Sequence, residues 1–196
     1  MRRSLPFAAA LLVLVLAASP AAGATRVITM DSSQDFDPAF VTIARGDSVR
    51  WKNLATSYSD HDVYGTAPNG YFATPGGAGG LGPGESYTFL FRAAGRYPFI
   101  CREHKGMTGR VSVPLALTEV ASGIKVTVAS ASQSGYRVRV QRKKGADGSW
   151  STAGTTTGKS LTWSPPSRGT YYFRARLERT ATGASSAWSP TRGITW

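Results

Sequence analysis

Short apolar or alternating runs follow one another along the whole chain, and turns rich in Gly and Pro separate them. Period-two runs bounded by such turns predict β-strands. In the first half of the chain they predict strands, read as antiparallel throughout, at residues 26–30, 40–44, 48–51, 86–91, 95–100 and 109–113. In the second half they predict strands at residues 123–128, 136–141, 160–163, 170–177 and 194–196. Residues 65–84 are expected to form a long Gly-rich connection without helical periodicity. Many short strands with this punctuation predict an all-β chain built from two-sheet sandwiches.

The first 24 residues differ from this pattern. They combine the basic Arg2-Arg3, an apolar run over residues 11–16 and a small-residue ending at residues 22–24, which is typical of a secretory signal peptide. The run is shorter than the roughly 20 residues of a membrane-spanning helix. No Cys follows it closely and no later run could span a membrane. We therefore expect an exported protein without a transmembrane segment, located in the periplasm, at the cell surface or outside the cell. The export route stays open.

Charge divides the remaining chain into two halves. Removal of residues 1–24 leaves 21 basic and 11 acidic residues, a net charge of +10. Residues 25–115 carry nine basic and eight acidic side chains, whereas residues 116–196 carry twelve and three. The first half is thus nearly neutral and the second strongly basic. We expect a signal peptide at residues 1–24 and two β-domains at residues 25–115 and 116–196.

A compact group of soft donors lies between two predicted strands, where Cys101, His104 and Met107 follow a C-x-x-H-x-x-M spacing. Thiolate and thioether ligands favour copper, and a trigonal site of two His and one Cys with a weak axial Met is the blue-copper arrangement. The second imidazole can come only from His61, the other His of the chain, which follows a polar segment after a predicted strand. The sequence therefore predicts one copper ion bound by these four residues.

The inventory of soft donors supports this prediction. The chain contains one Cys, two His and three Met, of which Met1 is the initiator and Met30 lies in a predicted strand. A single Cys in an exported chain cannot form an internal disulfide, and metal binding would shield its thiolate. The alternative is that Cys101 is a small buried hydrophobe, Met107 fills the core and both His are incidental.

Residues 25–115 also resemble a cupredoxin of the plastocyanin and amicyanin kind. The likeness lies in the C-x-x-H-x-x-M loop, in His61 and in Phe72, and in the segments Phe36-Asp37-Pro38, Val41-Thr42-Ile43, Gly46-Asp47-Ser48-Val49, Trp51-Lys52-Asn53, Gly84-Glu85-Ser86-Tyr87 and Gly95-Arg96-Tyr97. The resemblance implies a Greek-key β-sandwich and a one-electron carrier with a type 1 copper site. Two departures, Asp62 after the first ligand and Glu103 before the second, would each place a carboxylate beside the copper and affect its potential.

The site also suggests how electrons would reach the copper. His104 lies on a loop at the end of the expected sandwich and is the candidate solvent-facing ligand. Arg102 and Lys105 flank it, so a redox partner protein with an acidic rim would be steered there. Enzymes of related fold, such as nitrite reductases and multicopper oxidases, need further copper centres built from His. Both His of this chain are already assigned, so we expect no enzymatic activity.

Residues 116–196 resemble a smaller immunoglobulin-like sandwich of the fibronectin type III kind. The segments that carry the likeness are residues 134–140, 148–150, 169–176 and 186–190. Strand alternation directs Arg137, Arg139, Arg174 and Arg176 outward, and in the type III fold they share one sheet face. They would either stack with Trp188 and Tyr172 in a structural ladder or bind an anionic polymer, a membrane surface or a redox partner. Nucleic acid is not expected to be a partner of an exported protein.

These observations predict an exported copper protein that carries single electrons, with a basic accessory β-sandwich that positions it. A first alternative is a periplasmic or extracellular copper-binding or delivery protein. A second is an adhesion or scaffold module without a redox role. A visible absorption spectrum after addition of Cu(II) separates the three.

Overall fold

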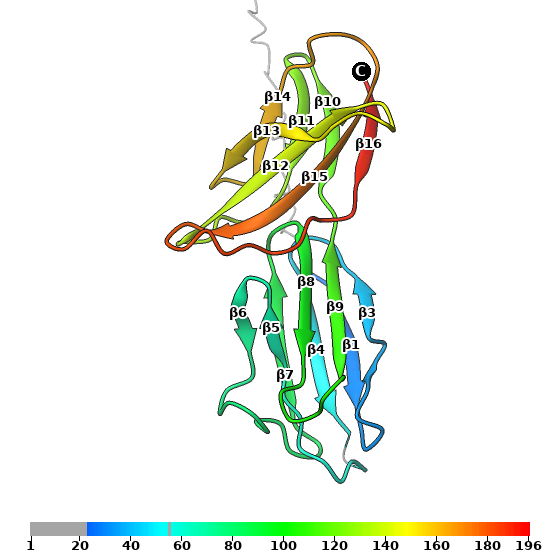
Figure 1. Cartoon of the computed structure of the whole chain (residues 1–196), viewed down its shortest axis with the longest axis vertical. Helices are drawn as coiled ribbons and strands as arrows, with labels where there is room; N and C mark the ends of the chain where they lie inside the picture. Colours follow the sequence, from blue (N-terminus) through cyan, green and yellow to red (C-terminus); the bar gives the residue numbers. More distant parts are fainter. Residues whose placement is uncertain (1–22, 55) are drawn as a thin grey trace, which may run out of the picture.

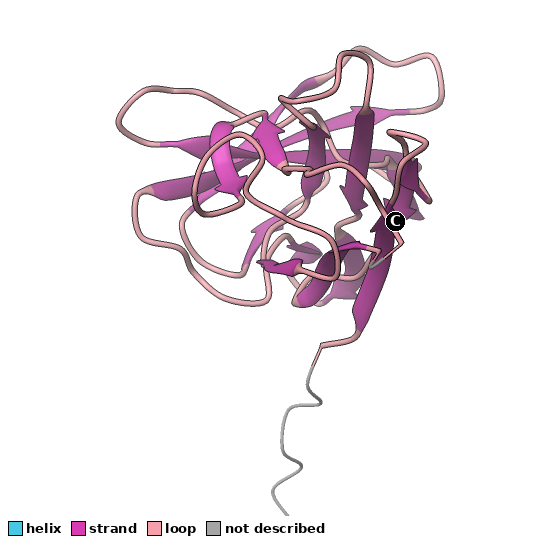
Figure 2. Ribbon diagram, turned by 90° about the horizontal axis from the view of Figure 1, so that it is seen from below, coloured by secondary structure: helices cyan, strands magenta, loops and turns pink. Residues whose placement is uncertain are grey.

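The computed structural model describes residues 23–54 and 56–196, and in these ranges it consists of strands and loops without a helix (Figures 1 and 2). The expectation of an all-β chain is thereby confirmed. Within the described ranges, no helix could cross a membrane. The expected signal peptide lies outside the described residues except for Gly23 and Ala24.

The first sheet of the N-terminal β-sandwich has the order β2-β1-β4-β7. Its strands are β1 (Thr25–Met30), β2 (Phe36–Asp37), β4 (Asp47–Asn53) and β7 (Ser86–Phe91). The second sheet has the order β3-β9-β8-β5-β6. It consists of β3 (Phe40–Thr42), β5 (Tyr64–Thr66), β6 (Asn69–Ala73), β8 (Gly95–Ile100) and β9 (Thr108–Val113).

Two pairings correct the expectation of antiparallel strands throughout. β1 pairs in parallel with β4, and β3 pairs in parallel with β9. Parallel neighbours are reached through crossovers, which leave no mark in the alternation of a single strand. The expected connection at residues 65–84 also contains most of the β5–β6 hairpin. These two strands are too short to show a periodic pattern.

Aromatic side chains hold the two sheets of this sandwich together. Trp51 of β4 is fully buried and packs edge-on against Phe99 of β8, with ring centroids 5.3 Å apart. Phe91 of β7 meets Tyr97 of β8 at 5.2 Å. Burying aromatic rings removes large apolar areas from water and adds specific ring contacts. The sandwich is therefore a firm base for the loops at its ends.

A second β-region follows, made of two further sheets. The first has the order β10-β11-β14, with β10 (Ala116–Val120), β11 (Gly123–Thr127) and β14 (Ser160–Trp163). The second has the order β13-β12-β15-β16, with β12 (Tyr136–Lys144), β13 (Ser151–Thr156), β15 (Thr170–Arg179) and β16 (Arg192–Thr195). Trp163 contacts the rings of Tyr171 and Phe173 across the two sheets, at 5.0 and 5.8 Å.

The two β-regions meet end to end through main-chain hydrogen bonds (Figure 1). Arg96 at the start of β8 exchanges two hydrogen bonds with Ala187, at 2.9 and 3.0 Å, and the Ala94 amide donates to Val128 at 2.7 Å. The Tyr71 hydroxyl and the Gln133 side chain are bonded at 2.9–3.1 Å. Such pairs fix the relative orientation of the two regions more firmly than a linker would.

Candidate metal centre

The segment from Cys101 to Met107 connects β8 to β9 at the end of the sandwich opposite the second β-region (Figure 1). Two main-chain hydrogen bonds close this loop. The Cys101 amide donates to the Met107 carbonyl at 3.1 Å, and the Met107 amide donates to the His104 carbonyl at 3.2 Å. Because the loop is braced by its own backbone and by the ladder between β8 and β9, its three soft donors have fixed positions.

His61 reaches the same place from a different part of the chain. It exchanges two main-chain hydrogen bonds with Leu81, at 3.0 and 2.8 Å, and is completely buried. Its ring Nε2 lies 2.9 Å from the carbonyl oxygen of Asp31. A carbonyl oxygen can only accept, so Nε2 carries the proton and Nδ1 presents its lone pair. This is how metal-binding His residues are usually oriented.

The nitrogen and sulfur atoms of the three residues converge. Cys101 Sγ lies 4.0 Å from His61 Nδ1 and 3.4 Å from His104 Nδ1, and the three donor atoms all lie within 4.8 Å of one another. Bonds of about 2.3 Å to sulfur and 2.0 Å to nitrogen, at angles near 110–120°, would separate such atoms by about 3.5–3.8 Å. The three side chains therefore fit a single first-row metal ion with little rearrangement.

Met107 completes the set as predicted from the spacing. Its side chain is buried, and it lines one surface hollow together with Cys101 and His104. His104 is half-buried, in contrast to the enclosed His61. One imidazole thus lies at the surface of the loop end, and the remaining donors are covered.

Burial shifts the pKa values of the Cys101 thiol and the His61 imidazole in opposite directions. Burial raises the pKa of the Cys101 thiol, while backbone N–H groups of Asp62, Glu103 and His104 act to lower it. The Asp62 amide lies 3.4 Å from the sulfur. Burial also lowers the pKa of His61, against the hydrogen bond to Asp31, which raises it. His61 is therefore neutral at pH 7, whereas Cys101 gives up a proton when a metal binds.

Of the charged residues next to the site, Asp62 and Arg102 form an ion pair, whereas Glu103 and Lys105 are exposed. The carboxylate of Asp62 is fully buried and accepts hydrogen bonds from both the backbone amide and Nε of Arg102. The Arg102 guanidinium also lies 4.6 Å from the centroid of the Tyr64 ring. Glu103 and Lys105 are exposed. Of the two basic residues expected to flank His104, Arg102 is thus occupied by an internal ion pair.

Comparison with known proteins gives this arrangement a family. Residues 24–114 match the sequence profile of the copper binding proteins of the plastocyanin/azurin family. A chloroplastic plastocyanin of Tetradesmus obliquus is 38% identical to this chain over 89 residues, covering 40% of the chain and 57% of the plastocyanin. Residues 24–114 form a cupredoxin domain of the plastocyanin/azurin family. The cofactor of this cupredoxin domain is copper, as its donor set indicates.

Solved structures that are similar to this chain cover about half of it. A reduced amicyanin mutant is 28% identical to this chain, with a TM-score of 0.39. The match covers 49% of this chain and 87% of the amicyanin chain. A purple cupredoxin from Nitrosopumilus maritimus is 22% identical to this chain, with a TM-score of 0.39. The match covers 45% of this chain and 98% of the purple cupredoxin. The chain spans little more than half the length of the plastocyanin that it matches.

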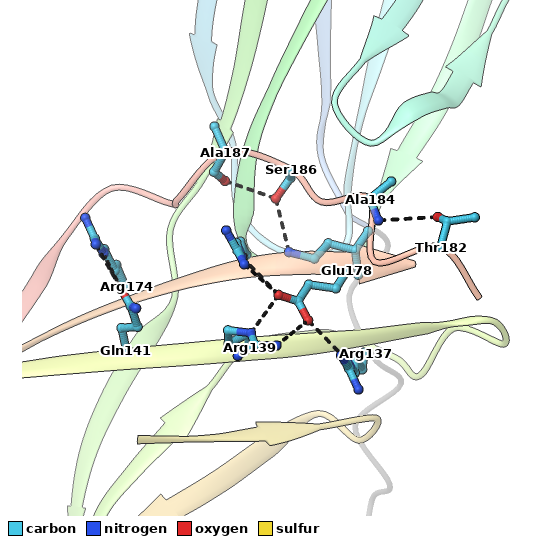
Figure 3. A network of polar contacts seen from close by, with 11 residues as sticks. Arg137, Arg139, Gln141, Arg174, Glu178, Thr182, Ala184, Ser186 and Ala187 are labelled. Atoms are coloured by element: carbon cyan, nitrogen blue, oxygen red, sulfur yellow. Dashed lines mark hydrogen bonds and ion pairs between the residues drawn. The ribbon is translucent and has the colours of Figure 1, made fainter. Parts of the chain in front are cut away.

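The four arginines predicted on one face of the second β-region do share a face. Arg137 and Arg139 of β12 lie beside Arg174 and Arg176 of β15 in an antiparallel ladder. Figure 3 labels Arg137, Arg139 and Arg174. Trp188 contacts both Arg174 and Arg176, as expected, but the second aromatic partner is Trp150, which contacts Arg174, and not Tyr172. Trp150 reaches the face from the residue before the edge strand β13, whereas Tyr172 meets Lys143 instead.

Two residues that support the site escaped the sequence analysis. The Asp31 carbonyl orients His61, and the Asn53 side chain donates to the carbonyls of Ser59 and Leu81, at 2.8 and 2.9 Å. Asn53 thereby braces both segments next to His61. A buried Asn at the end of an apolar strand was the available signal, because such a side chain needs partners.

Proposed function

We propose that this protein is a one-electron carrier whose copper ion is bound by His61, Cys101, His104 and Met107. The observation that carries the proposal is the convergence of two imidazole nitrogens and one thiolate sulfur within 4.8 Å. The position of Met107 in the same hollow supports the axial thioether of a type 1 site. An electron carrier of this family would need no catalytic residue, in keeping with the expectation that the chain is not an enzyme.

Copper supplies the change of one electron between Cu(II) and Cu(I). The residues of the chain supply a fixed set of donors, because Asp31 holds the ring of His61 and the braced loop holds the other three. Fixed donors keep the reorganisation on oxidation or reduction small, which favours fast transfer. The half-buried His104 forms the exit to the surface, and the buried donors exclude water. A redox partner would dock around His104.

Addition of Cu(II) to the mature chain tests this function. We expect an intense blue absorption that saturates at one equivalent and disappears and returns on reduction and reoxidation. Cys101→Ser should abolish the colour, because the thiolate ligand is lost. Thr108→Ser, which changes the exposed residue next to Met107, should retain it. A colourless wild-type protein after copper addition would refute the proposal.

The same titration separates the alternatives. A pale complex that rapidly loses its copper to a chelator would indicate copper binding or delivery. A folded protein that takes up no copper would indicate an adhesion or scaffold module. The burial of His61, Cys101 and Met107 argues against a delivery protein, whose site would be more open.

We further propose that residues 116–196 form a separate domain of the fibronectin type III kind. Its three-on-four strand order, β10-β11-β14 against β13-β12-β15-β16, supports this assignment. The Tyr171 hydroxyl also donates to the Ser167 carbonyl at 2.8 Å, like the tyrosine corner of immunoglobulin-like sandwiches. Residues 116–196 expressed alone should give a dispersed NMR spectrum, and an unfolded fragment would contradict the proposal.

Export remains part of the proposal. The sequence of residues 1–24 favours it. Expression of the full chain with its own N-terminus should give a secreted or periplasmic product whose mass corresponds to cleavage near residue 24. A product of full mass retained in the cytoplasm would contradict this.

A further inference from the structure

The outer face of the β13-β12-β15-β16 sheet carries an unusual set of side chains. We call it the arginine face and define it by Arg137, Arg139, Arg174, Arg176, Trp150, Trp188 and Glu178. Figure 3 labels Arg137, Arg139, Arg174 and Glu178 of this set. Its residues alternate along β12 and β15 with the buried residues of the core. The cupredoxin domain uses none of them for copper binding.

Glu178 anchors one part of the face. Only 2% of its side chain is exposed, and its oxygens accept hydrogen bonds from Arg139 at 2.7 and 3.2 Å and from Arg137 at 3.1 Å. Arg176 donates to the same carboxylate at 2.9–3.0 Å. A carboxylate offers about four acceptor positions, so Glu178 is saturated. The three guanidiniums are thereby held in fixed orientations.

Stacking anchors the other part. Arg174 lies 4.2 Å from the ring centroid of Trp150 and 4.7 Å from that of Trp188. Arg176 lies 4.6 Å from the Trp188 ring. The Arg174 guanidinium also donates to the Gln141 side chain at 2.8–3.0 Å. These cation–π contacts hold the guanidiniums without neutralising their charge.

The network leaves the face strongly cationic. Among the described residues, three of the four arginines share one carboxylate, and Arg174 has no acidic partner within ion-pair distance. Burial and then the charge of Arg176 lower the pKa of Arg174. Three guanidiniums carry roughly fifteen N–H donors, of which Glu178 takes about a third.

We propose that the arginine face binds a linear polymer with repeated phosphate or sulfate groups. Fixed, planar guanidiniums bind such oxyanions in pairs of hydrogen bonds. Side chains at alternate strand positions recur every 6–7 Å or so, which suits a chain of anionic groups. Among the described residues, the exposed large hydrophobics are Val27, Phe40 and Tyr58, all in the cupredoxin domain. The face therefore has no exposed large apolar anchor for a membrane or for a protein interface core.

Binding of long-chain inorganic polyphosphate to the copper-loaded mature protein tests the proposal. We compare the double variant Arg137→Gln/Arg174→Gln with Lys125→Gln/Lys159→Gln, which removes two exposed charges away from the face. The first should weaken binding about tenfold or more, and the second less than about threefold. Equal weakening by both variants would show attraction by net charge alone and overturn the proposal. Absence of wild-type binding would also overturn it.

Three further measurements make the result specific. Arg174→Gln alone leaves all contacts of Glu178 intact and should still weaken binding, even if the double variant unfolds. Binding should persist in Cys101→Ser, so failure of the copper proposal would not affect this one. Vesicles of phosphatidylglycerol should bind less tightly than polyphosphate at equal phosphate concentration. Preference for vesicles that the arginine-face variants remove would assign the face to membranes instead.

Discussion

Replacement of Glu178 by Gln is expected to destabilise the second β-region strongly. The substitution removes the negative charge that three arginines share and turns one acceptor oxygen into a donor group. Loss of one partner in a buried ion pair costs about 3–5 kcal/mol. The arginine side chains are 30–40% exposed, so water screens part of this loss. We expect a loss of about 2–3 kcal/mol in the free energy of unfolding.

Urea denaturation followed by circular dichroism measures this loss. By the usual conversion for a domain of 60–100 residues, the melting temperature of the second β-region should fall by roughly 8–24 °C. Glu119→Gln makes the same charge change at an exposed position of β10 and should stay within about 0.5 kcal/mol of the wild type. A Glu178→Gln variant as stable as this control would show that the arginine face does not depend on its buried carboxylate.

The same group gives a pH dependence with a definite sign. Burial acts to raise the pKa of Glu178, but hydrogen bonds from Arg139, Arg176 and Arg137 outweigh it and hold the pKa below its ordinary value. The unfolded chain then binds more protons than the folded one in acid. The contribution of Glu178 is complete above the unfolded pKa of about 4.3 and is lost as the pH falls through the folded value. The stability difference between wild type and Glu178→Gln should therefore shrink in acid.

Three further predictions concern the cupredoxin domain. Burial raises the pKa of Cys101 and lowers that of His61, so the thiol is protonated and the imidazole is neutral before copper binds. Copper uptake in weakly buffered solution near pH 7.5 should therefore release about one proton, which a pH indicator can detect. Release of no proton would contradict a protonated thiol. Gly109→Ala would place a Cβ 2.3 Å from Phe99 Cζ and 2.7 Å from the Ala39 carbonyl oxygen. The free energy of unfolding, measured by urea titration, should therefore fall by about 1–3 kcal/mol. Thr108→Ala, at the exposed neighbouring position, should have little effect. Tyr71→Phe removes the hydroxyl that is hydrogen-bonded to Gln133 across the junction. The free energy of unfolding should fall by about 0.5–1.5 kcal/mol, and the copper spectrum should not change. A changed spectrum would show that the junction and the metal site are coupled.

The copper ligands were predictable because few residues can bind a soft metal. One Cys, two His and one available Met left little choice, and the structure brings the two His and the Cys within bonding range of one ion. The groups that orient the ligands were harder to predict. The Asp31 contact uses a backbone carbonyl, which every residue possesses, so no side-chain pattern marks it.

Strand prediction succeeded where one face of a strand is buried. β7 and β8 begin and end at the expected residues, and β14 does so in the second region. Ser151–Thr156 was missed because this edge strand is almost entirely polar. The fate of Glu178 was also missed, although it continues the alternation of Arg174 and Arg176 along β15. The outward-facing position of Glu178 suggested that its side chain is exposed, but three guanidiniums cover the carboxylate.

The junction between the two β-regions relates the copper centre to the arginine face. β8 is six residues long; it begins at the junction, where Arg96 pairs with Ala187, and ends at Ile100, directly before the copper loop. A strand of this length spans about 20 Å. Trp188, which belongs to the arginine face, directly follows Ala187 in the chain. The part of the face that includes Trp188 therefore lies next to the junction, whereas the loop between β8 and β9, which carries His104, lies at the far end of the cupredoxin domain (Figure 1). Because hydrogen bonds fix this arrangement, an anionic polymer bound at the face would leave His104 directed away and open to a redox partner.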